Sequence, residues 1–166
     1  MPDFSLQDEN SHPLDLADLR GKIWIADVIF TRCAGQCLLM SAHLAALQKE
    51  LPPTLPIRFV SFTTDPAFDS PAILKKYAER YNADAARWIF LTGDKSALRH
   101  AIVDGLKLAA IDKTVAEQQD ANDLFVHSAK FVLIDGAGQI RGYFDGETEA
   151  SLPEIAAAAR RLAKEL

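Results

Sequence analysis

The sequence predicts an α/β fold in a single domain. Apolar runs rich in β-branched and aromatic residues alternate along the chain with segments in which apolar residues recur at helical spacing. The chain has 166 residues, which is enough to bury one substantial core. Apolar residues make up 49% and charged residues 25%, as in ordinary globular proteins. We therefore expect a central mixed sheet flanked by helices, with residues 1–166 forming one domain.

The N-terminal part of the chain predicts a hairpin, a buried strand and a helix. Apolar and polar residues alternate around a turn-rich centre over residues 4–14, which favours a small hairpin, and residues 15–19 can form one helical turn. Residues 23–30 are almost wholly apolar and predict a buried central strand. A helix is expected over residues 38–51, before Pro52-Pro53, with an apolar stripe of Leu39, Met40, Leu44, Leu47 and Leu51.

The middle of the chain repeats the alternation of strand and helix. Ser70, or alternatively Asp69, is expected to cap a helix that has Pro71 in its first turn and runs to residue 81. A less favoured interpretation makes the acidic segment over residues 64–71 a rim beside the dithiol. The other elements expected here are strands over residues 57–62 and 88–91, a helix from Asp94 or Ser96 towards residue 103, and a polar loop over residues 112–123.

The C-terminal part predicts a second hairpin and a closing helix. Its two strands are expected over residues 125–135 and 139–144, on either side of Gly136-Ala137-Gly138. An alanine-rich amphipathic helix is expected to begin near Ser151.

Cys33 and Cys37 are the only cysteines in the sequence, and they stand where the strand over residues 23–30 should meet the following helix. A dithiol at this junction fits a thioredoxin-like fold, in which the partial positive charge of the helix N-terminus stabilises a thiolate. Gly35 between them allows unusual backbone angles. A disulfide across so short a loop would add little stability. The pair therefore indicates redox chemistry or the binding of a soft metal.

A metal site needs a third ligand beside the two sulfurs, and His127 is the best-placed candidate. It stands where the expected loop meets a buried strand, a junction that approaches the dithiol turn in a thioredoxin-like fold. Two sulfurs and one imidazole favour Cu(I) or Zn(II) and, with added ligands, Cu(II); no fourth protein ligand for a closed zinc site is evident. Alternatively, His127 hydrogen-bonds a loop and binds no metal. The less favoured candidates, expected to be solvated or in the core, are His12, His43, His100 and Met40.

The sequence resembles the Sco/SenC family of copper-binding, thioredoxin-like assembly factors. The resemblance is carried by a series of segments spread over the chain: the opening Phe4-Ser5-Leu6, Phe30-Thr31-Arg32-Cys33 through Cys37 (F-T-x-C-x-x-x-C), residues 61–71 with D-P-x-x-D-S-P, Trp88 to Gly93, His127-Ser128, and Leu133 to Gly138.

By this resemblance, Cys33, Cys37 and His127 would be the ligands of a copper ion, Cu(I) or Cu(II), and the two cysteines a redox pair. The implied function is a metallochaperone that delivers copper to, or reduces the cysteines of, the copper centre in subunit II of cytochrome c oxidase. The implied location is extracytoplasmic, in the periplasm. The family's N-terminal membrane anchor does not occur in this chain.

The sequence departs from the family pattern around the site. Ala34 and Leu38 stand where the family motif C-P-x-x-C-P has prolines, so we expect a more flexible turn. Val126 precedes His127, where the family often has an aspartate that could orient the imidazole.

Other functions are consistent with the dithiol. A thiol–disulfide oxidoreductase acting on the cysteines of a partner would use Cys33 and Cys37 and would not need His127. A redox or copper sensor, or a peroxidase, is a further alternative, although the latter's usual Thr-x-x-Cys spacing is missing. The net charge of −5 argues against nucleic-acid binding. No apolar run reaches the ~20 residues of a membrane-spanning helix, and residues 1–4 lack the pattern of a signal peptide.

Overall fold

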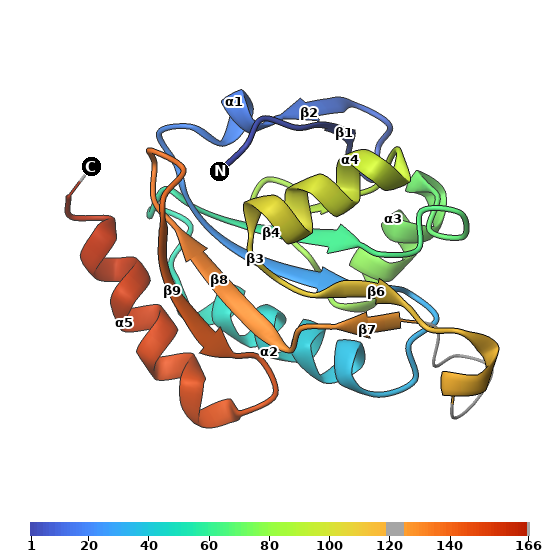
Figure 1. The fold of residues 1–166 in the computed structure, drawn as a ribbon. Coiled ribbons are helices and arrows are strands. Elements are labelled where there is room, and N and C mark those ends of the chain that lie inside the picture. Colours follow the sequence, from blue (N-terminus) through green and yellow to red (C-terminus); the bar gives the residue numbers. More distant parts are fainter. Residues whose placement is uncertain (119–124, 166) are drawn as a thin grey trace.

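A five-stranded mixed sheet forms the centre of the protein in the computed structural model, which describes residues 1–118 and 125–165 (Figure 1). The strand order is β5-β4-β3-β8-β9, in which β3, β4 and β5 are parallel while β8 and β9 pair antiparallel. The predicted mixed sheet is confirmed. Its strands are β3 (Ile23–Ile29), β4 (Ile57–Thr63), β5 (Trp88–Leu91), β8 (Lys130–Ile134) and β9 (Ile140–Asp145).

Helices cover both faces of this sheet, because alternate residues of β3 face two different apolar clusters. Ile25 and Ile29 pack with residues of α2, α3 and α5, whereas Ala26 and Val28 pack with α4 and the N-terminal hairpin. Burial on both faces explains why the strand is a nearly continuous apolar run. The helices are α2 (Gln36–Glu50), α3 (Pro71–Arg80), α5 (Leu152–Leu162) and α4 (Lys95–Arg99), which continues as a π-helical turn over His100–Gly105.

The N-terminal hairpin forms as predicted. It consists of β1 (Ser5–Gln7) and β2 (Pro13–Asp15), followed by the single helical turn α1 (Leu16–Leu19). Gln7 also forms a bridge with Thr92, which joins the hairpin to the segment after β5. Among the described helices, none combines the length and the apolar content that crossing a membrane requires.

A second small sheet differs from the sequence prediction. The expected strand over residues 125–135 is divided, because β7 (Phe125–His127) pairs with β6 (Ala110–Asp112) while β8 begins at Lys130 in the central sheet. The expected loop also contains a 3-10 turn, Val115–Glu117. An apolar run cannot show which strand each of its parts will pair with, so the division was not visible in the sequence.

The apolar stripe of α2 gives a direct test of the core. Leu44 is fully buried between α2 and the sheet, whereas Leu39, which was expected in the same stripe, is 43% exposed. We predict that Leu44→Ala lowers the free energy of unfolding by about 2–5 kcal/mol, because it leaves a cavity in the core. Leu39→Ala is the matched control and should change it by less than about 1 kcal/mol. Urea unfolding of both variants measures the difference, and equal effects would contradict this packing.

Candidate metal and redox site

The two cysteines lie together at the N-terminus of α2, as predicted. Cys33 is half-buried in the turn after β3, and Cys37 is fully buried in the first turn of the helix. The sulfur of Cys33 accepts a hydrogen bond from the backbone N–H of Cys37, at 3.4 Å. The N-cap residue is Gly35, which has no side chain to cap the helix. The Cys33 sulfur therefore takes the place of a capping oxygen, where the partial charge of the helix end favours a negative group.

The surroundings of the second sulfur favour its protonated form. A hydrogen bond with the Cys33 side chain, burial, and the charges of Cys33 and Asp27 raise the pKa of Cys37 above its ordinary value. Because Cys33 is the more exposed of the two, a metal ion or a disulfide bond of another molecule meets Cys33 first. The pair thus has an outer, accessible sulfur and an inner, buried one.

Asp27 is a buried acid near the pair that was not among the predicted site residues. It has no exposed surface and lies in β3 on the same face as Ile25 and Ile29, towards α2. Its charge acts on the pKa of Cys37. A single carboxyl group inside an otherwise apolar strand is rare in buried segments, and this signal could have identified Asp27.

Asp69 holds the turn that leads to Cys33. Its fully buried carboxylate accepts hydrogen bonds from the backbone N–H of Thr31 at 3.1 Å, from the Thr31 hydroxyl, and from the Thr63 hydroxyl at 2.5 Å. Burial raises the pKa of Asp69, an effect that the hydroxyl donors partly offset. Ser70, or alternatively Asp69, was expected to cap α3. Ser70 is the cap, accepting from the N–H of Ile73, while Asp69 binds the dithiol turn instead.

Asp65, the other acid of the D-P-x-x-D segment, holds the residue directly before Cys33. Its carboxylate forms a 2.5 Å ion pair with Arg32, and the Arg32 guanidinium lies 4.4 Å from the centre of the Phe68 ring. Asp65 is buried, so this pair is less screened than an ordinary surface ion pair. The two aspartates therefore fix the two residues that precede the dithiol.

The first turn of α2 shows what replaces the family's second proline. The N–H of Leu38 donates to the carbonyl of Gly35 at 3.1 Å, and the N–H of Leu39 donates to the same carbonyl at 3.3 Å. A proline at position 38 would have no N–H to donate. Leu38 can therefore make a hydrogen bond that a proline at this position could not make.

The backbone of His127 lies at the end of β7, opposite Ala110 of β6; its side chain is outside the part of the chain that the structure describes. The chain just beyond it approaches the dithiol helix. The carbonyl of Ala129 accepts a hydrogen bond from the backbone N–H of Gly146 at 2.8 Å. Gly146 is also close to α2: a Cβ atom added to this glycine would lie 2.8 Å from Met40 Cε and 3.2 Å from the Ala129 carbonyl oxygen. Met40 lies one turn after Cys37, so the segment after His127 lies against the start of α2.

The other histidines are placed away from the sulfurs. His12 is exposed beside Asp8, and His100 pairs with Asp104 on the surface. His43, which was expected to be solvated, is half-buried, and its Nδ1 lies 2.7 Å from the carbonyl of Gly146. Met40 is in the core, as expected. Among the described side chains, no group of three or more His, Cys, Asp or Glu residues could hold a metal ion.

Comparison with known proteins identifies a family that covers nearly the whole chain. The SCO1/SenC family model matches residues 1–164. A SCO1 protein homolog of Bacillus subtilis (strain 168) is 31% identical over 92% of this chain and 77% of its own length.

Solved structures of the same family have the same fold. A SCO1/SenC family lipoprotein from Bacillus anthracis has a TM-score of 0.86 at 29% identity, covering 98% of this chain and 94% of that one. BsSco, described as a member of the Sco family of cytochrome c oxidase assembly proteins with a disulfide switch, has a TM-score of 0.82 at 30% identity, covering 98% and 92%. Yeast Sco1 with copper bound has a TM-score of 0.76 at 25% identity, covering 96% and 87%. The thioredoxin-like fold is thereby confirmed.

The unequal exposure of the two sulfurs predicts unequal reactivity. With a limiting amount of iodoacetamide at neutral pH, we expect Cys33 to be alkylated at least about tenfold faster than Cys37. Burial and the hydrogen bond with the Cys33 side chain keep the Cys37 thiol protonated. Peptide mass spectrometry of the alkylated protein measures the two rates. The difference should vanish in urea, and equal rates in the folded protein would contradict the arrangement.

The buried carboxyl of Asp69 predicts a pH dependence of stability. Burial raises its pKa, so the folded protein holds this proton to a higher pH than the unfolded chain does. The stabilisation from the proton is complete below the unfolded pKa and is lost as the pH rises through the folded one. The stability advantage of wild type over Asp69→Asn should therefore be larger near about pH 4 than near about pH 7.

Urea unfolding at several pH values measures this advantage. Asp3→Asn is the control, since the Asp3 side chain is 91% exposed, and its difference from wild type should stay nearly constant. An advantage of wild type over Asp69→Asn that grows with pH would contradict the raised pKa.

Proposed function

Because the chain belongs to the SCO1/SenC family, we propose that it is a Sco-type copper-binding protein that binds one copper ion through Cys33, Cys37 and His127. The observation that carries the proposal is the placement of both sulfurs at one helix N-terminus, one accessible and one buried. Two thiolates are soft donors that suit copper, and copper is the cargo of the protein. Binding would release the proton from Cys37, since a metal-bound thiol is deprotonated.

His127 is the proposed third ligand. Its backbone position and the contact of Ala129 with Gly146, next to Met40, bring this part of the chain to the start of α2. A neutral imidazole would complete the S₂N donor set that the sequence predicts. Yeast Sco1, a relative in fold and sequence, has been solved with copper bound, which supports the choice of metal.

The proposed recipient is a cysteine-bearing, copper-receiving protein, subunit II of cytochrome c oxidase. The support is the family resemblance together with the relative BsSco, which is described as belonging to a family of cytochrome c oxidase assembly proteins. We place the protein outside the cytoplasm, in the periplasm, because a related protein is a lipoprotein.

A second function, thiol–disulfide exchange with a partner, is favoured by the asymmetry of the two sulfurs. Cys33 is accessible for attack on a partner's disulfide, and Cys37 lies behind it to resolve the mixed disulfide. In this exchange the two thiols pass two electrons and two protons to the partner's disulfide, which becomes two thiols, and the Cys33–Cys37 disulfide that forms has no thiolate left to bind a metal ion. Copper binding and the disulfide form of the pair would therefore exclude each other.

Copper titration of the reduced protein tests the ligand set. We expect one tight equivalent of Cu(I) in the wild type, measured by competition with a chromophoric chelator, and loss of this binding in Cys33→Ser. His127→Ala should weaken binding by about tenfold or more, since one of three ligands is gone.

His12→Ala is the matched control for His127→Ala, because the His12 side chain is 75% exposed and should not affect copper. Stoichiometric tight binding that survives removal of both cysteines would rule out the proposed site. Full affinity in His127→Ala would rule out the third ligand.

A further inference from the structure

The strand β6, which pairs with the strand that carries His127, is only partly covered by the rest of the fold. β6 and β7 form a two-stranded sheet separate from the central one. In β6, Ala110 is half-buried, whereas Ile111 is 54% exposed and Asp112 is exposed. The buried Leu108 and the half-buried Ala110 anchor the start of the strand, whereas apolar burial contributes little at residues 111 and 112, so polar contacts also help to hold β6.

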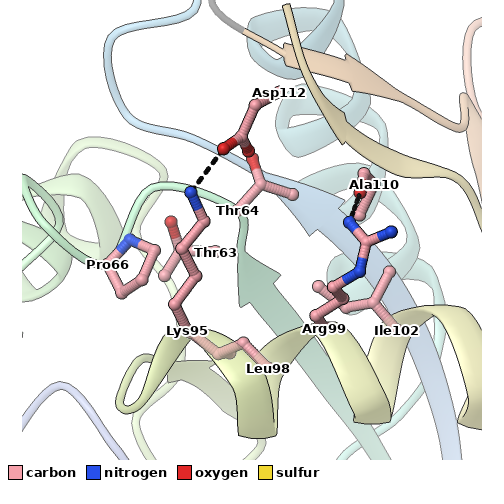
Figure 2. A pocket seen from close by; sticks show the side chains of 9 residues that line it. All are labelled: Thr63, Thr64, Pro66, Lys95, Leu98, Arg99, Ile102, Ala110 and Asp112. Atoms are coloured by element: carbon pink, nitrogen blue, oxygen red, sulfur yellow. Dashed lines mark hydrogen bonds and ion pairs between the residues drawn. The ribbon is translucent and has the colours of Figure 1, made fainter.

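Two cations of α4 bind β6, as Figure 2 shows. Arg99 donates from Nη1 to the carbonyl of Ala110 at 2.9 Å, and Lys95 forms a 2.5 Å ion pair with Asp112. Lys95 and Arg99 are four residues apart and so lie on the same face of the helix. Ala110 and Asp112 are two residues apart and so have the same orientation in the strand.

The register of the hairpin carries these contacts to His127. Ala110 pairs with His127, so Arg99 bonds the residue directly opposite the proposed ligand. The helix that provides the arginine is itself fixed, since Leu98 and Ile102 are 2% and 1% exposed in the core. A movement of Ala110 away from α4 would therefore move the backbone of His127 with it.

A small pocket lies between α4, β6 and the end of β4 (Figure 2). Its lining includes Thr63 and Thr64 at the end of β4 together with Arg99 and Ala110. Thr63 donates to Asp69, which binds the turn that leads to Cys33. The end of β4 therefore lies near β6, the partner of the strand that carries His127, and is also linked through Asp69 to the turn that carries Cys33.

We propose that Arg99 is a positioning residue for the copper site, which holds β6 and thereby places His127 relative to Cys33 and Cys37. The proposal rests on the proposed function, because it requires His127 to bind the metal. Lys95 contributes less, since its ion pair with Asp112 is exposed on both sides and exposed pairs are weak. The hydrogen bond of Arg99 is exposed as well, but it holds the backbone of Ala110, the residue that pairs with His127.

The test compares Cu(I) affinity and metal-free dynamics in four variants. Arg99→Gln should weaken Cu(I) binding about threefold to tenfold, because the charged hydrogen bond to Ala110 is lost. Arg99→Lys, which can still donate to the carbonyl, should recover most of the affinity. Arg141→Gln is the matched control: it removes one arginine charge and its contacts with Asp135 and Glu165, far along the chain from α4, and should leave copper binding unchanged.

The fourth variant, the double substitution Arg99→Gln/His127→Ala, identifies the route of the effect. If Arg99 acts through His127, the double variant binds copper as His127→Ala alone does. An equal loss from Arg99→Gln with and without His127 would overturn the proposal, since the arginine would then act on the fold or on the sulfurs.

A readout without copper separates this proposal from the proposed function. In metal-free protein, Arg99→Gln should speed hydrogen exchange of the backbone amides of residues 110–112, and Arg141→Gln should not. Unchanged exchange at these amides would overturn the role of Arg99. Faster exchange in Arg99→Gln, combined with full copper affinity in His127→Ala, would show instead that His127 is not a ligand. The role of Arg99 at the copper site would then also be overturned, although its role in holding β6 would stand.

Discussion

The placement of the dithiol depends on the hydrogen bonds that the buried carboxyl group of Asp69 accepts. β3 and β4 pair in parallel up to Ile29 and Thr63, and beyond this point the backbones no longer pair. Asp69 continues the connection past the strand ends, because it binds Thr31 on one side and Thr63 on the other. Thr31 is two residues before Cys33, so the outer sulfur is held at a defined distance from the sheet. The ion pair of Arg32 with Asp65 adds a second connection to the same turn.

Two opposing electrostatic effects act on the sulfurs. The start of α2 directs an N–H at the sulfur of Cys33 and favours negative charge there, whereas burial and the charge of Asp27 favour a protonated Cys37. In the metal-free protein, Cys33 is therefore expected to be the more reactive thiol and Cys37 to stay protonated. A bound cation would reverse the balance at Cys37, because its positive charge favours the thiolate. The same geometry therefore suits both metal binding and thiol exchange, and the third ligand distinguishes them.

The sequence predicted the fold and the dithiol well because both depend on local patterns. The apolar run that became β3, the helical spacing in α2 and the cysteines between them are visible within about 30 residues. The contacts of Asp69 with Thr31 and of Arg99 with Ala110 were not predicted, because the first joins residues 38 positions apart and the second depends on which strand β6 would pair with. Ser70 caps α3 as predicted, and Asp69, the alternative cap, binds the dithiol turn. Its motif is compatible with capping, and only the parallel neighbour β3 provides the competing donors.

In the proposed site, one copper ion is bound by the two sulfurs and by His127. X-ray absorption spectroscopy of the protein loaded with one equivalent of Cu(I) tests it most directly, because sulfur and imidazole neighbours scatter differently. We expect two sulfur neighbours and one imidazole nitrogen, with the imidazole signal lost in His127→Ala and retained in His12→Ala. A first shell without imidazole, or one unchanged by His127→Ala, would contradict it.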